Sequence, residues 1–342
     1  MTNLTQLINS RVNRRFRRLT LNTVITLYIL IMVGGVVRST GAGMGCPDWP
    51  KCFGSWIPPT EVSQLPLDYK EIYGAKLKGE VIFNPVKTWI EYVNRLFGVF
   101  TGIMIFGTLI ASIPYLKSDR KSLFFYSLLA FILVGLQGWL GSKVVSSELH
   151  PVMITIHMLL AIVIVFILIY LFIRASYSPE RDGKLFADQG LINKFSLLVL
   201  TLSLIQILIG TQVRELMDEV IRALGYEGRA KWVEELGVPF YIHRSFSILV
   251  LAANLFWINK IIRSIPGESR IKQMGLGCLV ILGVEIFTGI VMAYFGVPAF
   301  AQPIHLTLAV IMIGLQFMMW LLMNASRFSW GKEIVRLKRD LV

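Results

Sequence analysis

Eight apolar segments of about 20 residues divide this sequence, and each is long enough to cross a bilayer as an α-helix. Hydrophobic residues make up 55 % and charged residues 16 % of its 342 positions, which is too apolar for one soluble core. We therefore predict an all-α integral membrane protein. The segments lie at residues 19–37, 87–113, 122–145, 151–174, 193–214, 238–263, 272–296 and 301–325.

Basic residues alternate with these segments along the chain and give a formal net charge of +13. Because membrane proteins keep Lys and Arg in their cytoplasmic loops, this pattern predicts that both termini are cytoplasmic, or on the matrix side of a mitochondrial membrane. The charge therefore indicates topology, and we expect no nucleic-acid partner. The clusters are Arg11, Arg14, Arg15, Arg17 and Arg18; Lys117, Arg120 and Lys121; Arg174, Arg181 and Lys184; Lys260, Arg263, Arg270 and Lys272; and Arg336, Lys338 and Arg339.

The second half of the chain repeats residues of the first half. The aligned pairs are Asn94 with His243, at an offset of 149 residues, His157 with His305 and Gln137 with Glu285, both at 148, and Arg38 with Arg214, at 176. A unit of four helices ends on the side where it began, so its copy forms a parallel repeat about an axis along the membrane normal. This predicts two four-helix bundles, at 19–174 and 193–325, with an outer loop at 38–86. We also expect the first helix to be retained and not cleaved as a signal peptide.

Two cysteines lie in the predicted first outer loop. Cys46 and Cys52 face an oxidising compartment there, which favours a disulfide. The alternative is a pair of free thiols in a turn held by Pro47 and Pro50. The third cysteine, Cys278, lies in the seventh apolar segment, where we interpret it as a small core residue.

Three of the four histidines lie inside apolar segments. His157, His243 and His305, together with Asn94, are about 8–11 Å from the outer ends of their predicted helices at 1.5 Å per residue. His243 and His305 come from the second and fourth helices of one bundle at matching depth, which is typical of two axial ligands on one haem iron. An isolated intramembrane histidine more simply makes an interhelical hydrogen bond. Zinc would need further ligands, which the sequence does not supply at this depth.

The first half departs from this pattern because Asn94 replaces the histidine, and asparagine is a poor haem ligand. In one interpretation, an ancestral site has decayed into a structural polar contact. In the other, His157 alone binds a second haem and leaves the opposite face of the iron open for oxygen or a reacting group. Asn94 would then donate a hydrogen bond to whatever occupies that face.

Four charged residues, Glu91, Arg95, Arg244 and Glu285, also lie within the apolar segments. A charge at the bilayer centre costs about 2.5–3.5 kcal/mol on insertion scales, so these side chains require partners. Haem propionates would suit Arg95 and Arg244, and Glu91, one turn from Asn94, is a candidate acid or base. The alternative is that the four pair with one another.

Other polar residues lie at the ends of the predicted helices. Arg38 and Arg214 are either propionate partners or residues that extend to the membrane surface, and His150 is a surface or N-cap residue. Several glycines either let helices pack closely or leave space for a macrocycle. They are Gly34, Gly35, Gly135, Gly138 and Gly141.

These residues lie in motifs that resemble the haem A synthases, membrane enzymes that oxidise a methyl group of haem O to the formyl group of haem A. The motifs cover nearly the whole chain: GGVVRSTGAGMGCPDWPKC, EYVNR, LQGWLGSKVVSSEL and ITIHMLLA in the first half, and YIHR and IHLTLA in the second. The resemblance implies haem b at His243 and His305, and a haem O/haem A site that uses His157 and the surroundings of Glu91. It also matches Cys46 and Cys52 to the cysteine pair of the family. Asn94, and the lack of a cysteine pair at 215–237, depart from it.

The resemblance predicts an oxidoreductase for terminal oxidase assembly in a bacterial plasma membrane. Methyl oxidation is too difficult for side chains alone, so a closed haem would relay electrons, an open one would react, and Glu91 would handle protons. Haem O is then the substrate and haem O synthase a candidate partner, while the electron donor is not indicated. The competing interpretations are a dihaem cytochrome in quinol-linked electron transfer and a haem-carrying assembly factor.

Overall fold

The computed structural model describes residues 2–74, 83–177, 189–265, 269–325 and 328, which form helices and no β-strand. Eight long helices have the length and composition to cross a membrane, as predicted. They are α1 (Thr2–Ser39), α3 (Pro85–Ser112), α4 (Ser122–Ser146), α5 (Pro151–Ser176), α7 (Gln189–Leu224), α9 (Gly237–Ser264), α10 (Arg270–Tyr294) and α11 (Ala301–Met323). Short helices α2 (Tyr69–Gly74) and α8 (Trp232–Glu235) lie between them.

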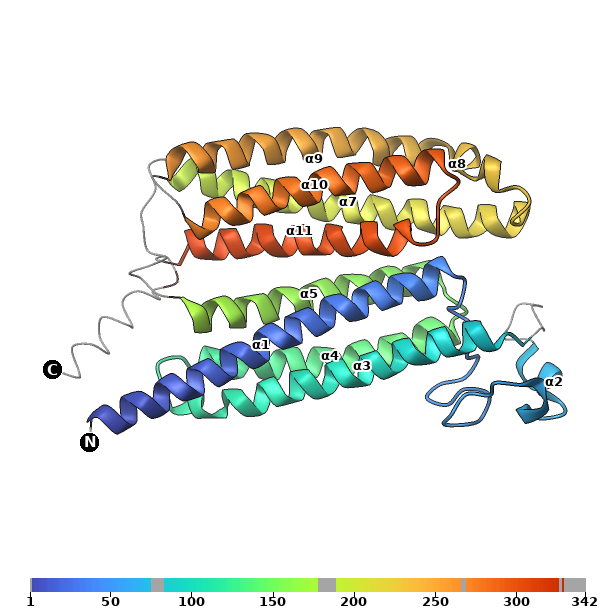
Figure 1. Cartoon of the computed structure of the whole chain (residues 1–342), viewed down its shortest axis with the longest axis horizontal. Helices are drawn as coiled ribbons and strands as arrows, with labels where there is room; N and C mark the ends of the chain where they lie inside the picture. Colours follow the sequence, from blue (N-terminus) through green and yellow to red (C-terminus); the bar gives the residue numbers. More distant parts are fainter. Residues whose placement is uncertain (1, 75–82, 178–188, 266–268, 326–327, 329–342) are drawn as a thin grey trace.

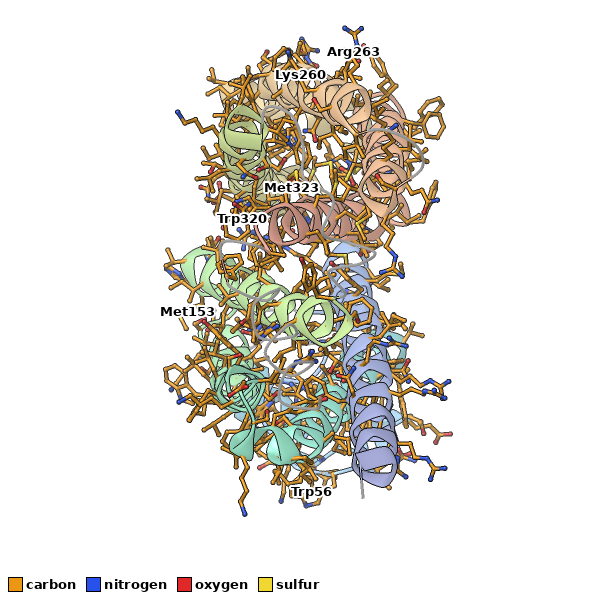
Figure 2. The ribbon with its side chains drawn as sticks, turned by 90° about the vertical axis from the view of Figure 1, so that its left-hand side faces the viewer. Trp56, Met153, Lys260, Arg263, Trp320 and Met323 are labelled. Carbon is orange, nitrogen blue, oxygen red and sulfur yellow. A yellow bond between two sulfur atoms is a disulfide. The ribbon has the colours of Figure 1, made fainter. Side chains whose placement is uncertain are left out.

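The long helices form two groups of four, one from each half of the chain (Figure 1). In the first group α1 packs on α3 and α5, and α4 joins α3 to α5; in the second α7 packs on α9 and α11, and α10 joins α9 to α11. Viewed along the helices, the groups lie side by side, with α11 of the second group next to the first group (Figure 2).

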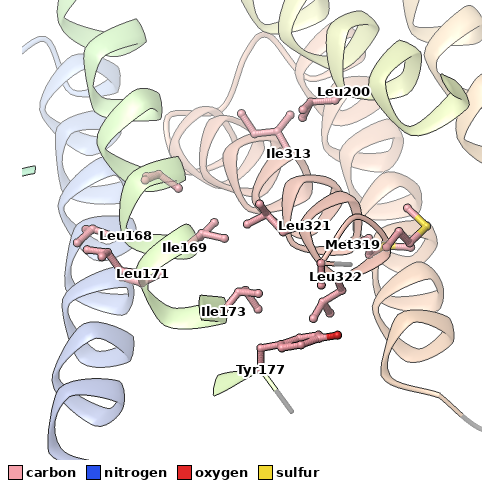
Figure 3. Packing of buried hydrophobic residues seen from close by; sticks show 14 of the residues in the cluster. Leu168, Ile169, Leu171, Ile173, Tyr177, Leu200, Ile313, Met319, Leu321 and Leu322 are labelled. Carbon is pink, nitrogen blue, oxygen red and sulfur yellow. The ribbon is translucent and has the colours of Figure 1, made fainter. Parts of the chain in front are cut away.

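The two groups meet where α11 packs against α1 and α5. Ile169 and Ile173 of α5 point toward Leu321 and Leu322 of α11, within one buried apolar cluster (Figure 3). Close approach of α1 to α11 depends on Gly35, because a Cβ there would lie 3.0 Å from the Pro303 Cα. The interface is not symmetrical, since α5 and α7 make few contacts.

The start of α1 and the end of α11 lie at one end of the molecule, and α2 and α8 lie at the other (Figure 1). The described basic clusters, including Lys260 and Arg263 (Figure 2), belong to the first of these ends. This agrees with the predicted alternation of charge along the chain. The predicted basic residues Arg181, Lys184, Arg336, Lys338 and Arg339 lie outside the described residues.

Two helices are longer than their apolar segments. Helix α1 begins at Thr2, and α7 continues to Leu224, beyond the predicted end at residue 214. Part of the 215–237 region expected as a loop is therefore helical. An ion pair between Arg214 and Asp218, four residues apart, stabilises this polar extension.

The first outer loop folds into a small subdomain. Cys46 and Cys52 form the predicted disulfide, and both are buried. They pack with aromatic residues of the loop and of α2, including Phe53 and Tyr73. Residues 75–82 of this loop lie outside the described residues. The third cysteine, Cys278, is free and buried in α10.

Candidate functional site

The second group of helices brings two predicted ligands face to face. The ring centroids of His243 on α9 and His305 on α11 are 6.4 Å apart, with an interplanar angle of 67°. Two imidazoles bound at about 2 Å to opposite sides of one metal ion have centroids about 6 Å apart. The centroid separation is therefore compatible with ligation of one haem iron by both histidines.

The Nδ1 atoms of these two histidines have different surroundings. Nδ1 of His305 lies 2.9 Å from Thr288 Oγ1 and 3.0 Å from Glu285 Oε2, both on α10. Nδ1 of His243 is buried without a hydrogen bond to any described residue. In both rings Nε2 is thus the nitrogen available to a metal.

Asn94 on α3 and His157 on α5 hold the matching positions in the first group. Asn94 Oδ1 and His157 Nδ1 are buried, and neither has a hydrogen-bond partner in the described part of the chain. Gln137 donates to the backbone oxygen of His157 at 2.9 Å. Because the Asn94 acceptor is buried, its Nδ2 donor is the polar atom available to a ligand.

A glycine on a neighbouring helix faces each of these four side chains. Gly34 faces Asn94, Gly141 faces His157, Gly210 faces His243 and Gly289 faces His305; a Cβ at each would lie 3.8, 3.5, 3.1 and 3.8 Å from the facing side chain. Glycine inside a helix is less favourable than alanine by about 1 kcal/mol, so space is the better explanation for it here. The four glycines thus leave room for the facing Asn and His side chains to lie close to the neighbouring helix.

Gly210→Ala is expected to weaken haem binding in the second group more than Gly289→Ala does. The new Cβ would lie 3.1 Å from His243 Cε1, whereas at Gly289 it would make ordinary contact with His305 at 3.8 Å. Overpacking of about 1–3 kcal/mol corresponds to a roughly 5- to 150-fold higher dissociation constant. Haem content of the purified variants by pyridine haemochrome measures this, and equal content in both would contradict it. Both changes raise helix propensity alike, so each controls for the other.

Glu91 and Arg95 connect α3 to the disulfide loop. Glu91 is 4 % exposed; its Oε2 accepts from the Cys46 backbone N–H at 2.8 Å, and its Oε1 pairs with Arg95 at 2.5 Å. Arg95 also donates to the backbone oxygens of Cys46, Asp48 and Lys51. For Glu91 and Arg95, though not for Arg244 and Glu285, this is the mutual pairing that the sequence left as the alternative. A propionate role for Arg95 stays a prediction.

The remaining predicted residues lie at the edges of the two groups. Exposed Arg244 stacks on the rings of Phe240 and Tyr241, so its propionate role also stays a prediction. His150 occupies the N-cap position of α5, is exposed and makes no side-chain capping bond.

An ion-pair cluster joins the two halves at their outer ends. Arg38 and Arg214 both bind Asp218, at 3.0 and 2.5 Å, and Arg214 also donates to the backbone oxygen of Arg38. The sequence analysis missed Asp218, although its spacing of four from Arg214 was a usable signal. It also missed Thr288, which lies one turn from Glu285.

The described residues contain no group of three or more His, Cys, Asp or Glu side chains that could hold a metal ion. A metal bound by protein side chains alone is therefore not supported there. Two facing histidines suit a metal that arrives with its own equatorial ligands, which is what a porphyrin provides.

Comparison with known proteins gives one consistent result. The sequence model of the cytochrome oxidase assembly protein family COX15-CtaA matches residues 17–317. Haem A synthase of Bartonella bacilliformis is 25 % identical over 353 residues, covering 94 % of this chain and 96 % of that protein. Haem A synthase of Rickettsia prowazekii is 23 % identical, covering 85 % of this chain and 92 % of that protein. Haem A synthase of Agrobacterium fabrum is 25 % identical, covering 90 % of this chain and 90 % of that protein.

Proposed function

The chain belongs to the cytochrome oxidase assembly protein family COX15-CtaA, and we propose on this premise that it is a haem A synthase, an oxidoreductase that converts haem O to haem A. The observation that carries the proposal is the similarity along almost the entire chain, which includes both histidine-bearing groups of helices. Bacterial relatives and eight candidate spans indicate an integral membrane protein. We place it in a bacterial plasma membrane with both termini cytoplasmic.

The second group would hold haem b. His243 and His305 would occupy both axial positions, and their 6.4 Å centroid separation supports this. An iron closed by two imidazoles supplies one-electron transfer and no open coordination position. The residues of this group therefore act by binding the haem, excluding other ligands and setting its potential.

The first group would hold the substrate haem. His157 would help to hold it, and Asn94 would offer its Nδ2 donor to a small molecule bound nearby. Glu91, one turn away, would accept protons as the methyl group is oxidised to the alcohol and then the aldehyde. Its hydrogen bond from Cys46 and its pair with Arg95 support a fixed position for that carboxylate.

The assignment of haem b to one bundle and the substrate haem to the other assumes a parallel repeat of two bundles, 19–174 and 193–325. Matching glycines beside Asn94, His157, His243 and His305 support that repeat. Haem O synthase is the proposed partner that supplies haem O, and the bilayer surrounds both bundles.

Co-expression with a haem O synthase tests the function. Membranes would be extracted, and their haems separated by chromatography and identified by mass and pyridine-haemochrome spectra. We expect haem A, or its hydroxylated precursor, only when this chain is present, with cells expressing haem O synthase alone as the control. Haem b bound to the protein with haem O unconsumed would contradict the synthase and favour an electron-transfer cytochrome.

A further inference from the structure

Glu285 Oε2 lies 3.0 Å from Nδ1 of His305, a proposed haem ligand in the second group. We propose that Glu285 is a positioning residue that strengthens His305 as an axial ligand and lowers the reduction potential of the haem b site. This inference rests on the proposed function, because it assumes that His243 and His305 bind haem b.

The hydrogen bonds around His305 determine which ring nitrogen carries its proton. Thr288 donates its only hydroxyl proton to the backbone oxygen of Glu285, at 3.0 Å. Its oxygen is then left to accept from His305 Nδ1, 2.9 Å away, and Glu285 Oε2 lies 3.0 Å from the same nitrogen. These surroundings favour a proton on Nδ1, which leaves the Nε2 lone pair free for iron.

A carboxylate that accepts from the outer nitrogen of a metal-binding histidine makes the imidazole a more basic ligand. A more basic axial ligand stabilises ferric over ferrous iron and so lowers the potential. Thr288 orients the ring but carries no charge, so the electronic effect is assigned to Glu285.

The first group lacks this arrangement at the matching positions. Gln137 takes the place of Glu285, and its amide donates to the backbone oxygen of His157 at 2.9 Å. Leu140 takes the place of Thr288, and His157 Nδ1 is buried with no partner among the described residues. The halves therefore differ at the positions that would tune a haem iron.

A purely structural contact would not need a carboxyl group at this position. Glu285 is 8 % exposed and lies within a membrane-spanning helix, where a carboxylate is costly. Gln137 shows that a neutral amide of the same length can join the third and fourth helices of a bundle. The retained carboxyl group is thus better explained by its effect on His305.

The test is a spectroelectrochemical titration of the full-length, haem-loaded protein. Glu285→Gln should raise the midpoint potential of the bis-histidine haem by at least about 59 mV, a tenfold change in a one-electron equilibrium constant. Thr288→Val, which keeps the carboxylate, should shift it less. Gln137→Glu, which adds a carboxyl group in the other bundle, should leave this haem unchanged.

An unchanged potential in Glu285→Gln with full haem content would overturn the inference. If that variant loses its haem, Glu285→Asp is measured instead. Aspartate is one methylene shorter, so its carboxylate lies farther from His305 and the midpoint potential should rise by less than is expected for Glu285→Gln. An unchanged midpoint potential again overturns the inference. Failure of the proposed function looks different, because the unaltered protein would then show no bis-histidine haem spectrum.

Discussion

Glu91→Gln is expected to lower haem A formation by about 10²- to 10⁴-fold, the usual contribution of a positioned acid or base. Glutamine keeps the size of the side chain and can still accept from the Cys46 backbone N–H, but it cannot take up a proton. It also breaks the ion pair with Arg95. Haem A per mole of protein, measured with haem O supplied, gives the effect, and haem b content should be unchanged.

Loss of the ion pair could also act by loosening the disulfide loop, so a second variant is needed. Thr88→Val removes the hydrogen bond from Thr88 to the Gly45 backbone oxygen, 2.8 Å long, and leaves the Glu91 carboxylate intact. If proton transfer is the role of Glu91, Thr88→Val retains most activity. Equal losses in both variants would assign Glu91 to loop anchoring, and a fully active Glu91→Gln would exclude it from proton transfer.

The membrane-spanning part of the fold was predictable because bilayer thickness fixes the length of an apolar helix. All eight predicted segments correspond to helices. The ends of α1 and α7 were not predictable in this way. Both helices continue into polar sequence, where hydropathy no longer marks a boundary and helix-stabilising pairs such as Arg214 with Asp218 decide the length.

Contacts within one helix could be anticipated, and contacts between distant segments could not. The spacing of four from Glu91 to Arg95 allowed their pairing. Nothing local indicated that Arg95 would also bind the loop at Cys46, Asp48 and Lys51, or that Arg38 would reach Asp218. Such contacts depend on how segments pack, which residue periodicity does not encode.

The approach of His243 to His305 was an expectation from equal depth in a repeat, and the structure brings the two rings together. Depth alone did not identify Thr288 as a partner of His305, because Thr288 is an ordinary helix residue by sequence. The repeat pattern also did not predict that α11 would pack closely against α1 and α5 while α7 makes few contacts with α5.

Asn94→His is expected to close the proposed open site in the first group and to abolish haem A formation. Asn94 aligns with His243, and Gly34 faces Asn94 in the same way as Gly210 faces His243. An imidazole at this position could therefore become a second axial ligand opposite His157. Iron with two imidazoles has no position for an added ligand, so the reduced variant should lose carbon monoxide binding.

Asn94→Leu distinguishes the effect of an open coordination position from the effect of the hydrogen bond proposed for Asn94. It removes the Nδ2 donor without adding a ligand, so carbon monoxide should still bind, with a changed stretching frequency because its hydrogen-bond donor is gone. Carbon monoxide difference spectra and infrared spectra of the unaltered protein and both variants measure these effects. If Asn94→His retains the spectrum and carbon monoxide binding of the unaltered protein, residue 94 does not face the iron, and a decayed site becomes the better explanation of the asparagine.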